Sequence, residues 1–264
     1  MSQLTHLRLE RPAAGVALLV LDNPDQRNAM SEEMTASWGA AIDELVGDPT
    51  VRVVVVTGAG SAFCSGGNTS WLAGETGTTG DQLRTKMLAF YRAWLSIRRL
   101  EVPTIAALNG AAVGAGLCLP LACDIRVATP TAKLGVPFLK LGLHPGMAGT
   151  FLLPDVVGPA AARDLFLTGR MVQGEEALRL GLVTRLVEAD GFIDEVLEMA
   201  SGVAANAPIA TRLTKVALAG GGHHDVDSAV QWEALAQPIT LATADLQEGL
   251  RASKERRAPL FEGR

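Results

Sequence analysis

Two stretches of the sequence share one design, in which a buried strand runs into a glycine-rich turn and then into a helix. The first is the β-branched run 53–57 followed by 58–68, and the second is 104–108 followed by 109–117. A turn after a strand leaves backbone N–H groups without partners, and glycine lets a ligand approach them closely. Two such turns side by side can direct N–H groups at one oxygen atom, as in an oxyanion hole.

Other interpretations of these turns are weaker. Either turn taken singly could serve only to pack a helix tightly against a strand. A nucleotide-binding module is disfavoured because the first turn lacks the GxGxxG pattern and the chain contains no GK[ST]. The chain also contains no GxSxG, which disfavours an α/β-hydrolase nucleophile.

The composition of the 264-residue chain is that of a globular protein. Its net charge of -5 offers no basic field for nucleic acid or an anionic membrane. Residues 1–30 lack a signal-peptide pattern, and no apolar run reaches membrane-spanning length. The three cysteines form no CxxC, so we expect neither a disulfide framework nor a metal site, and we expect a cytoplasmic protein.

Hydrophobic periodicity predicts an α/β fold with a core at residues 1–190 and a helical C-terminal region at 191–264. The predicted strands are 7–10, 15–21, 53–57, 104–108, 124–128, 133–136 and 182–187. The predicted helices are 31–46, with Ser31 as N-cap, then 83–95, 159–168, 174–181, 190–205, 208–219, 225–236 and 240–257. The segment 110–122 is predicted as a turn that enters a helix of small residues.

Several longer motifs follow one another along the chain. They are Asn23-Pro24 with 27–30, then 58–67, 103–110 through 121–126, 141–146, 167–169 and 181–183. In content, order and spacing these motifs closely resemble the enoyl-CoA hydratase/isomerase (crotonase) superfamily. The resemblance runs from about residue 7 to the C-terminus.

The resemblance implies a crotonase-like spiral of ββα units with a helical C-terminal region used in trimerisation. It implies an enzyme that stabilises the enolate of an acyl-CoA or enoyl-CoA thioester, a lyase or an isomerase. Coenzyme A would arrive as part of the substrate, with no permanently bound cofactor. The implied assembly is a homotrimer or a hexamer.

Residue roles can be carried over from the resemblance by position. The two oxyanion donors would be the N–H groups of Gly67 and Ala115. Arg27 and Ala29 would lie near the adenosine part of coenzyme A. Arg256 matches a basic position that can reach a phosphate, sometimes across a subunit boundary, although a solvated helix end is an equal alternative.

The sequence departs from the family at the positions of its acids. Hydratases of the family use two glutamates, which align with Cys118 and Phe138, and other branches use an acid that aligns with Gly146. Adding water to an enoyl thioester requires a base and an acid, and Phe138 can be neither. Efficient crotonyl-CoA hydration is therefore doubtful, and a non-catalytic acyl-CoA-binding protein is the alternative.

Few residues could replace the missing acids. His144 lies in the right loop and is the first candidate, and the thiol of Cys118 is the second. Glu75 and Asp81 flank the loop over the expected acyl pocket. The run His223-His224-Asp225 with Asp227 invites a metal interpretation, but a surface turn is favoured.

Apolar side chains are expected to line the acyl pocket. The candidates are Trp71, Leu72, Tyr91, Trp94 and Phe138, although core packing is favoured for Tyr91 and Trp94. Phe138 in place of an acid would make the site drier and narrower, which suits a bulky, cyclic or aromatic acyl group.

Overall fold

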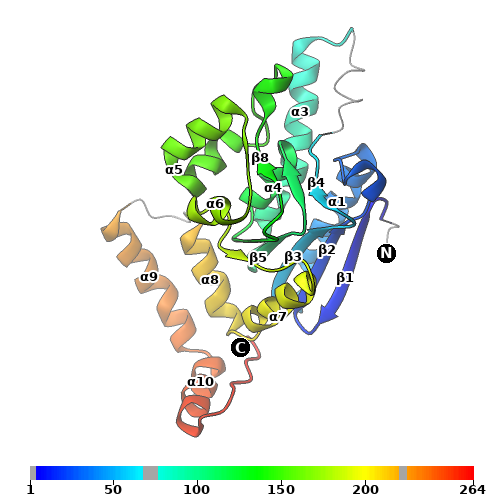
Figure 1. Ribbon diagram of the computed structural model, residues 1–264. Helices are drawn as coiled ribbons and strands as arrows, with labels where there is room; N and C mark the ends of the chain where they lie inside the picture. The colour runs from blue at the N-terminus through cyan, green and yellow to red at the C-terminus, as the bar shows by residue number, and fades with distance from the viewer. Residues whose placement is uncertain (1–3, 68–76, 220–224) are drawn as a thin grey trace.

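The computed structural model describes residues 4–67, 77–219 and 225–264. Five residues singled out above lie outside this part of the chain, namely Trp71, Leu72, Glu75, His223 and His224. The described strands form two sheets (Figure 1). The larger sheet has the order β1 (Leu7–Ala13), β2 (Val16–Leu21), β3 (Val53–Gly58), β5 (Thr104–Leu108), β7 (Ile125–Ala128), β10 (Arg185–Leu186). The smaller has the order β4 (Ala62–Cys64), β6 (Ala111–Val113), β8 (Leu134–Gly135), β9 (Met171–Val172).

The chain builds both sheets together, as a spiral. Each turn adds one strand to the larger sheet and the next strand to the smaller one: β3 then β4, β5 then β6, β7 then β8. A helix follows each pair, and these helices are α3 (Gly80–Trp94), α4 (Ala115–Leu121) and α5 (Gly149–Thr168). Strands joined this way are parallel, and antiparallel pairing is confined to β1 with β2 and β8 with β9. The expected α/β fold of ββα units is confirmed.

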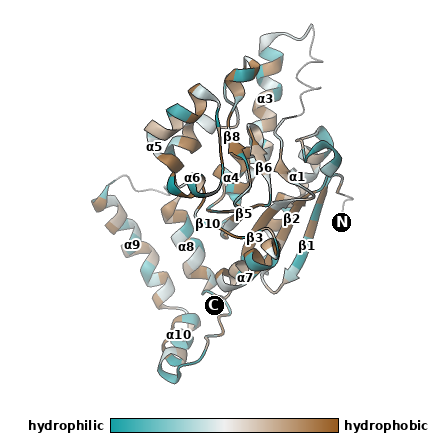
Figure 2. Ribbon diagram, viewed as in Figure 1, coloured by the Kyte–Doolittle hydropathy of each residue, from teal (hydrophilic) through white to brown (hydrophobic). Residues whose placement is uncertain are grey.

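The larger sheet is covered on both faces, which explains its continuous apolar strands. Alternate residues of β2 point to opposite sides: Leu19 packs with α1 (Glu32–Gly47), and Leu18 packs with α7 (Phe192–Ala204). At the edge, β1 carries hydrophilic residues along its exposed side (Figure 2). Ser31 caps α1 as predicted, because its side chain accepts a hydrogen bond from the N–H of Met34.

The C-terminal helices differ in how they pack. α7 belongs to the core, whereas α9 stands apart from both sheets (Figure 1). α9 has no buried residue and exposes large apolar side chains, among them Val230, Leu235, Ile239 and Leu241. The remaining helices are α6 (Gly174–Arg179), α8 (Pro208–Leu218), α9 (Val226–Leu241) and α10 (Ala244–Glu255), with short 3₁₀ helices η1 (Pro24–Gln26), η2 (Leu95–Arg99) and η3 (Phe138–Leu141).

The structure corrects some predicted boundaries. The segment 110–122, predicted as a turn that enters a helix, contains strand β6 before α4 begins. The helix predicted from 159 is the second half of α5, which starts at Gly149 and continues past a kink at Gly158. Within the described residues, no helix is both long and apolar enough to cross a bilayer.

Candidate functional site

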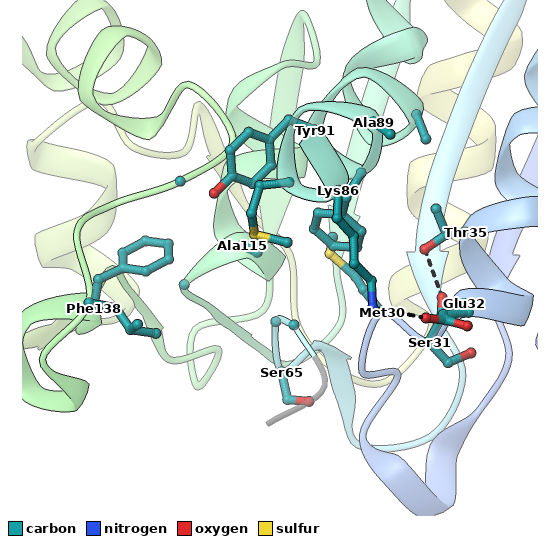
Figure 3. A pocket seen from close by; sticks show the side chains of 18 of the residues that line it. Met30, Ser31, Glu32, Thr35, Ser65, Lys86, Ala89, Tyr91, Ala115 and Phe138 are labelled. Atoms are coloured by element: carbon teal, nitrogen blue, oxygen red, sulfur yellow. Dashed lines mark hydrogen bonds and ion pairs between the residues drawn. The ribbon is translucent and has the colours of Figure 1, made fainter. Parts of the chain in front are cut away.

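A cavity of about 990 Å³ opens between the two glycine-rich turns and the helices α1 and α3. Figure 3 shows its walls, with Ser31, Glu32 and Thr35 of the α1 segment on one side and Tyr91, Ala115 and Phe138 on the other. The loop after η3 completes the apolar side. The walls include four residues predicted for the site from the two turns and this region, Gly67, Ala115, Phe138 and His144.

The two glycine-rich turns meet backbone to backbone. A Cβ atom on Gly66 would lie 2.7 Å from the carbonyl oxygen of Val113, and Gly66 has a φ of +102°, so a larger residue is strained there twice over. A Cβ atom on Gly116 would overlap the carbonyl oxygen of Cys64. Glycine is therefore required at both positions because the two turns approach each other closely. Such an approach serves helix packing, and it is also what an oxyanion hole needs.

Gly67 and Ala115 both line the cavity. Ala115 is the first residue of α4, so its N–H has no partner inside the helix. Among the described residues, no backbone hydrogen bond outside the regular elements uses either N–H. Both donors are thus available on the side of the cavity where the turns meet.

The first turn is fastened to the segment at 27–30. The N–H of Ser65 donates to the carbonyl of Arg27 at 3.0 Å, and the N–H of Met30 donates to the carbonyl of Gly66 at 2.8 Å. Asn28 anchors the segment, since its buried Nδ2 donates to two carbonyl oxygens of the β3–β4 connection, at 2.9 and 2.8 Å. The motif residues at 27–30 therefore hold the oxyanion turn in place.

The residues expected near coenzyme A lie outside the cavity wall. The side chain of Arg27 is exposed and Ala29 is partly exposed, both beside the first turn. Arg256 is the C-cap of α10, which lies at the opposite end of the molecule from α3 (Figure 1). Within one chain, Arg256 does not join the site.

The structure shows where the three residues lie that stand at the positions of the family's acids. Phe138 and Gly146 line the cavity, and the ring of Phe138 approaches to 3.7 Å from a Cβ atom on Gly114. Cys118 is buried and is not part of the wall. Burial raises the pKa of Cys118 to about 12, so its thiol stays protonated at neutral pH.

The other candidates for carrying a proton differ in whether they line the cavity. His144 is exposed at the cavity wall, and its Nδ1 lies 2.8 Å from the carbonyl oxygen of Pro145. Asp81 is exposed in the first turn of α3, pairs with Arg84 at 3.7 Å and does not line the cavity. Asp225 caps α9, and the described residues include no group of three or more metal-ligating side chains.

Sequence reasoning missed two sets of cavity residues. At the polar end, Lys86 of α3 pairs with Glu32 of α1 at 3.5 Å (Figure 3). Tyr91 was expected in the core, yet it lines the cavity and is only half-buried. Helical spacing placed Tyr91 on the inner face of α3, but it could not show that this face borders a cavity. Trp94 does pack in the core, stacked on Trp38 at 4.9 Å.

Comparison with known proteins gives a consistent result. A family model described as enoyl-CoA hydratase/isomerase matches residues 11–264. The chain is 44% identical over 216 residues to a protein of Mycobacterium tuberculosis H37Rv described as a probable enoyl-CoA hydratase, EchA14, covering 80% of this chain and 82% of that one.

Two further proteins extend the comparison. The (E)-benzylidenesuccinyl-CoA hydratase of Thauera aromatica is 35% identical over 94% of this chain and 96% of its own length. The crystal structure of an enoyl-CoA hydratase from Bacillus anthracis superposes with a TM-score of 0.93 at 33% identity, covering 98% of this chain and all of that one.

Proposed function

Because this chain belongs to the enoyl-CoA hydratase/isomerase family, we propose that it is an enzyme that stabilises the enolate of an acyl-CoA or enoyl-CoA thioester. The single observation that carries the proposal is the pair of glycine-rich turns that meet at the cavity wall. Gly67 and Ala115 line the cavity at this point, and we propose that the N–H group of each is directed into it. The thioester carbonyl oxygen would lie between the two donors.

The chemistry follows from where charge develops. Removing or adding a proton at the carbon next to a thioester carbonyl places negative charge on the carbonyl oxygen. Two fixed N–H donors, one of them at the start of α4, stabilise that charge without reorganising. One such donor is worth on the order of 10²–10³-fold in rate.

The possible reactions are narrowed because none of the three positions at which relatives would carry an acid has a carboxylate. Cys118 is a buried protonated thiol, Phe138 is apolar and Gly146 has no side chain. Isomerisation, retro-type carbon–carbon cleavage or hydrolysis of a thioester needs fewer acid–base groups than hydration, and we favour these reactions. Phe138, together with the similarity to a hydratase of benzylidenesuccinyl-CoA, favours a bulky or aromatic acyl group.

The same missing groups favour one other function. A protein that binds acyl-CoA thioesters without converting them would keep the cavity and the donors and would need no acid. The two functions differ in one measurable respect, which is turnover.

Assembly is the remaining part of the proposal. The exposed apolar side chains of α9 are typical of a contact between subunits. We propose a homotrimer or a hexamer formed through this helix. Arg256, which is remote from its own cavity, would then contact a phosphate of coenzyme A in the cavity of a neighbouring subunit.

The proposal is tested with a panel of acyl- and enoyl-CoAs incubated with the protein in D₂O. Mass spectrometry then detects deuterium at the α-carbon or a new product. Exchange or product with bulky acyl groups is the expected result. Measurable binding without exchange or product would identify a binding protein, and crotonyl-CoA hydration at rates normal for the family would contradict the reaction class.

A further inference from the structure

Few of the described side chains around the cavity can carry a proton. Among the described wall residues, the ionisable groups are Glu32, Glu33, Lys86, Tyr91 and His144. Glu32 and Lys86 pair with each other between α1 and α3, on the far side of the cavity from Phe138 (Figure 3), and Glu33 follows Glu32 in α1. His144 is exposed at the rim. Tyr91 remains.

Tyr91 is packed onto the backbone of Gly146. A Cβ atom on Gly146 would lie 2.5 Å from the Oη atom of Tyr91 and 2.9 Å from its Cζ atom. Any side chain at position 146 would therefore displace the phenol. The hydroxyl points away from Lys86 and toward the side of the cavity where Phe138 lies (Figure 3). The phenol thus occupies the volume that a residue at 146 would use.

This location is on the same side as the oxyanion donors. Ala115 and Cys118 lie three residues apart and so share a face of α4. The thiol of Cys118 donates to the carbonyl of Gly146 at 3.6 Å, which fixes the Gly146 backbone against that face. Tyr91 lies over Gly146 and close enough to Cys118 for the two groups to interact electrostatically. Tyr91 therefore lies over the Gly146 backbone that the Cys118 thiol joins to α4, and in Figure 3 it lies on the same side of the cavity as Ala115.

The protonation state of the phenol suits a donor. Burial, together with the nearby Cys118 thiol, raises the pKa of Tyr91 above its ordinary value. The hydroxyl therefore carries its proton at neutral pH. The remaining ionisable groups around the cavity, Glu32, Glu33, Lys86 and His144, belong to α1, to α3 one turn or more away, and to the loop after η3.

We propose that Tyr91 is the proton donor to the thioester enolate in this site. The inference rests on the proposed function, because it needs an enolate held by Gly67 and Ala115. As the enolate collapses, the carbonyl C=O re-forms, a C–H bond forms at the α-carbon and the Tyr91 O–H bond breaks. The resulting phenolate recovers a proton from water at the open side of the cavity. In the reverse direction the phenolate removes the α-proton.

The first test is Tyr91→Phe, which keeps the ring and removes only the hydroxyl. Losing a positioned proton donor lowers the turnover rate by about 10²–10⁴-fold. We expect kcat and the rate of α-deuteration to fall to this extent with the best substrate of the panel. The dissociation constant of that thioester is expected to stay within about threefold, because the ring still fills its place. The matched control is Thr85→Val, which removes an exposed hydroxyl from the same helix outside the cavity.

The second test exploits the fact that the chain contains a single tyrosine. Biosynthetic replacement of tyrosine by 3,5-difluorotyrosine changes this phenol alone and lowers its pKa. If the protonated phenol is the donor, the alkaline loss of kcat moves to lower pH in the fluorinated enzyme. If the ring has only a structural role, the pH at which kcat declines in alkali would be the same in both enzymes.

The outcomes separate the two proposals. If the wild-type protein turns over a thioester and Tyr91→Phe turns it over within about threefold as fast, the role of Tyr91 is wrong and the enolate function stands. The same holds if fluorination leaves the pH profile in place. If the wild-type protein binds no thioester, or binds without exchange or product, both proposals fail. A large fall in kcat with unchanged binding and a shifted alkaline limb supports both.

Discussion

The S–H group of Cys118 donates to the carbonyl oxygen of Gly146 across 3.6 Å, which joins helix α4 to the loop after η3. The two residues stand at positions where relatives of this chain were expected to carry acids. One is behind the cavity wall and the other has no side chain. The site therefore keeps the arrangement of the family's backbone while the expected carboxylates are absent from it.

Replacing Ala115 by proline removes one proposed oxyanion donor and little else. Proline is tolerated at the first position of a helix, because the N–H there has no helical partner. We expect Ala115→Pro to lower the turnover of a thioester by about 10²–10³-fold. The matched control is Gly80→Pro, which places proline at the first position of α3 on an exposed residue that does not line the cavity. Equal activity of the two variants would contradict the oxyanion role, provided that both melt near the wild-type temperature.

Shortening Phe138 tests the choice of acyl group. Phe138→Ala removes an aromatic wall close to Gly114, and the loss of that contact costs about 1.5–3 kcal/mol for a ligand that buries against the ring. We expect the dissociation constant of an aryl-acyl-CoA to rise at least tenfold, with that of acetyl-CoA nearly unchanged. Isothermal titration of both ligands checks this. An equal change for both would show that the ring does not select the acyl group.

Asn28 should matter for stability more than its polar side chain suggests. Its amide makes two buried hydrogen bonds to the β3–β4 connection, and its Oδ1 accepts from the N–H of Asn23. Asn28→Ala leaves these groups unsatisfied, and we expect the free energy of unfolding to fall by about 3 kcal/mol or more. Urea denaturation measures this against Asn206→Ala, which removes an exposed amide. A comparable small effect in both would contradict the anchoring role.

Stability should fall in alkali because of the three thiols. Burial raises the pKa of Cys64, Cys118 and Cys123 to about 12 each. The unfolded chain releases these protons near pH 8.5, whereas the folded chain retains them. Stability from each thiol is thus complete below about pH 8.5 and declines by about 1.4 kcal/mol per pH unit until the folded pKa is passed.

The measurement is urea denaturation at pH 8 and pH 10.5, comparing the wild type with a variant in which all three cysteines are alanine. The difference in free energy between the two proteins should shrink at the higher pH. A constant difference would mean that the folded thiols ionise like those of the unfolded chain. Other groups that titrate in this range are common to both proteins and cancel.

Helix α9 provides a test of assembly. Leu235→Glu places a charge among exposed apolar side chains, which is costly if a neighbouring subunit covers them. We expect sedimentation to show a trimer or a hexamer for the wild type and a smaller species for the variant. Gln173→Glu, which adds the same charge at an exposed residue outside α9, is the control. A wild-type monomer would contradict the proposed assembly.

The fold was more accessible from the sequence than the site was. The buried run of β3 and the cap at Ser31 have strong local signals, and both were predicted correctly. Strands β4 and β6 have three residues each, too short for any periodicity to be detected, so the spiral was known only through the family resemblance. Tyr91 was misplaced for a related reason: a helix face that borders a cavity has the same apolar spacing as one that borders the core.

The close approach of Cys64 and Gly116 limits how such a protein can change. Where two main chains touch, the separation of the two turns is set by atomic radii, and a larger residue at Gly116 would push them apart. Changes in substrate are consequently expected at wall positions whose side chains can be exchanged, such as Phe138, Tyr91 and Lys86. The backbone of the two turns is thus fixed by packing, whereas the side chains that line the cavity can change.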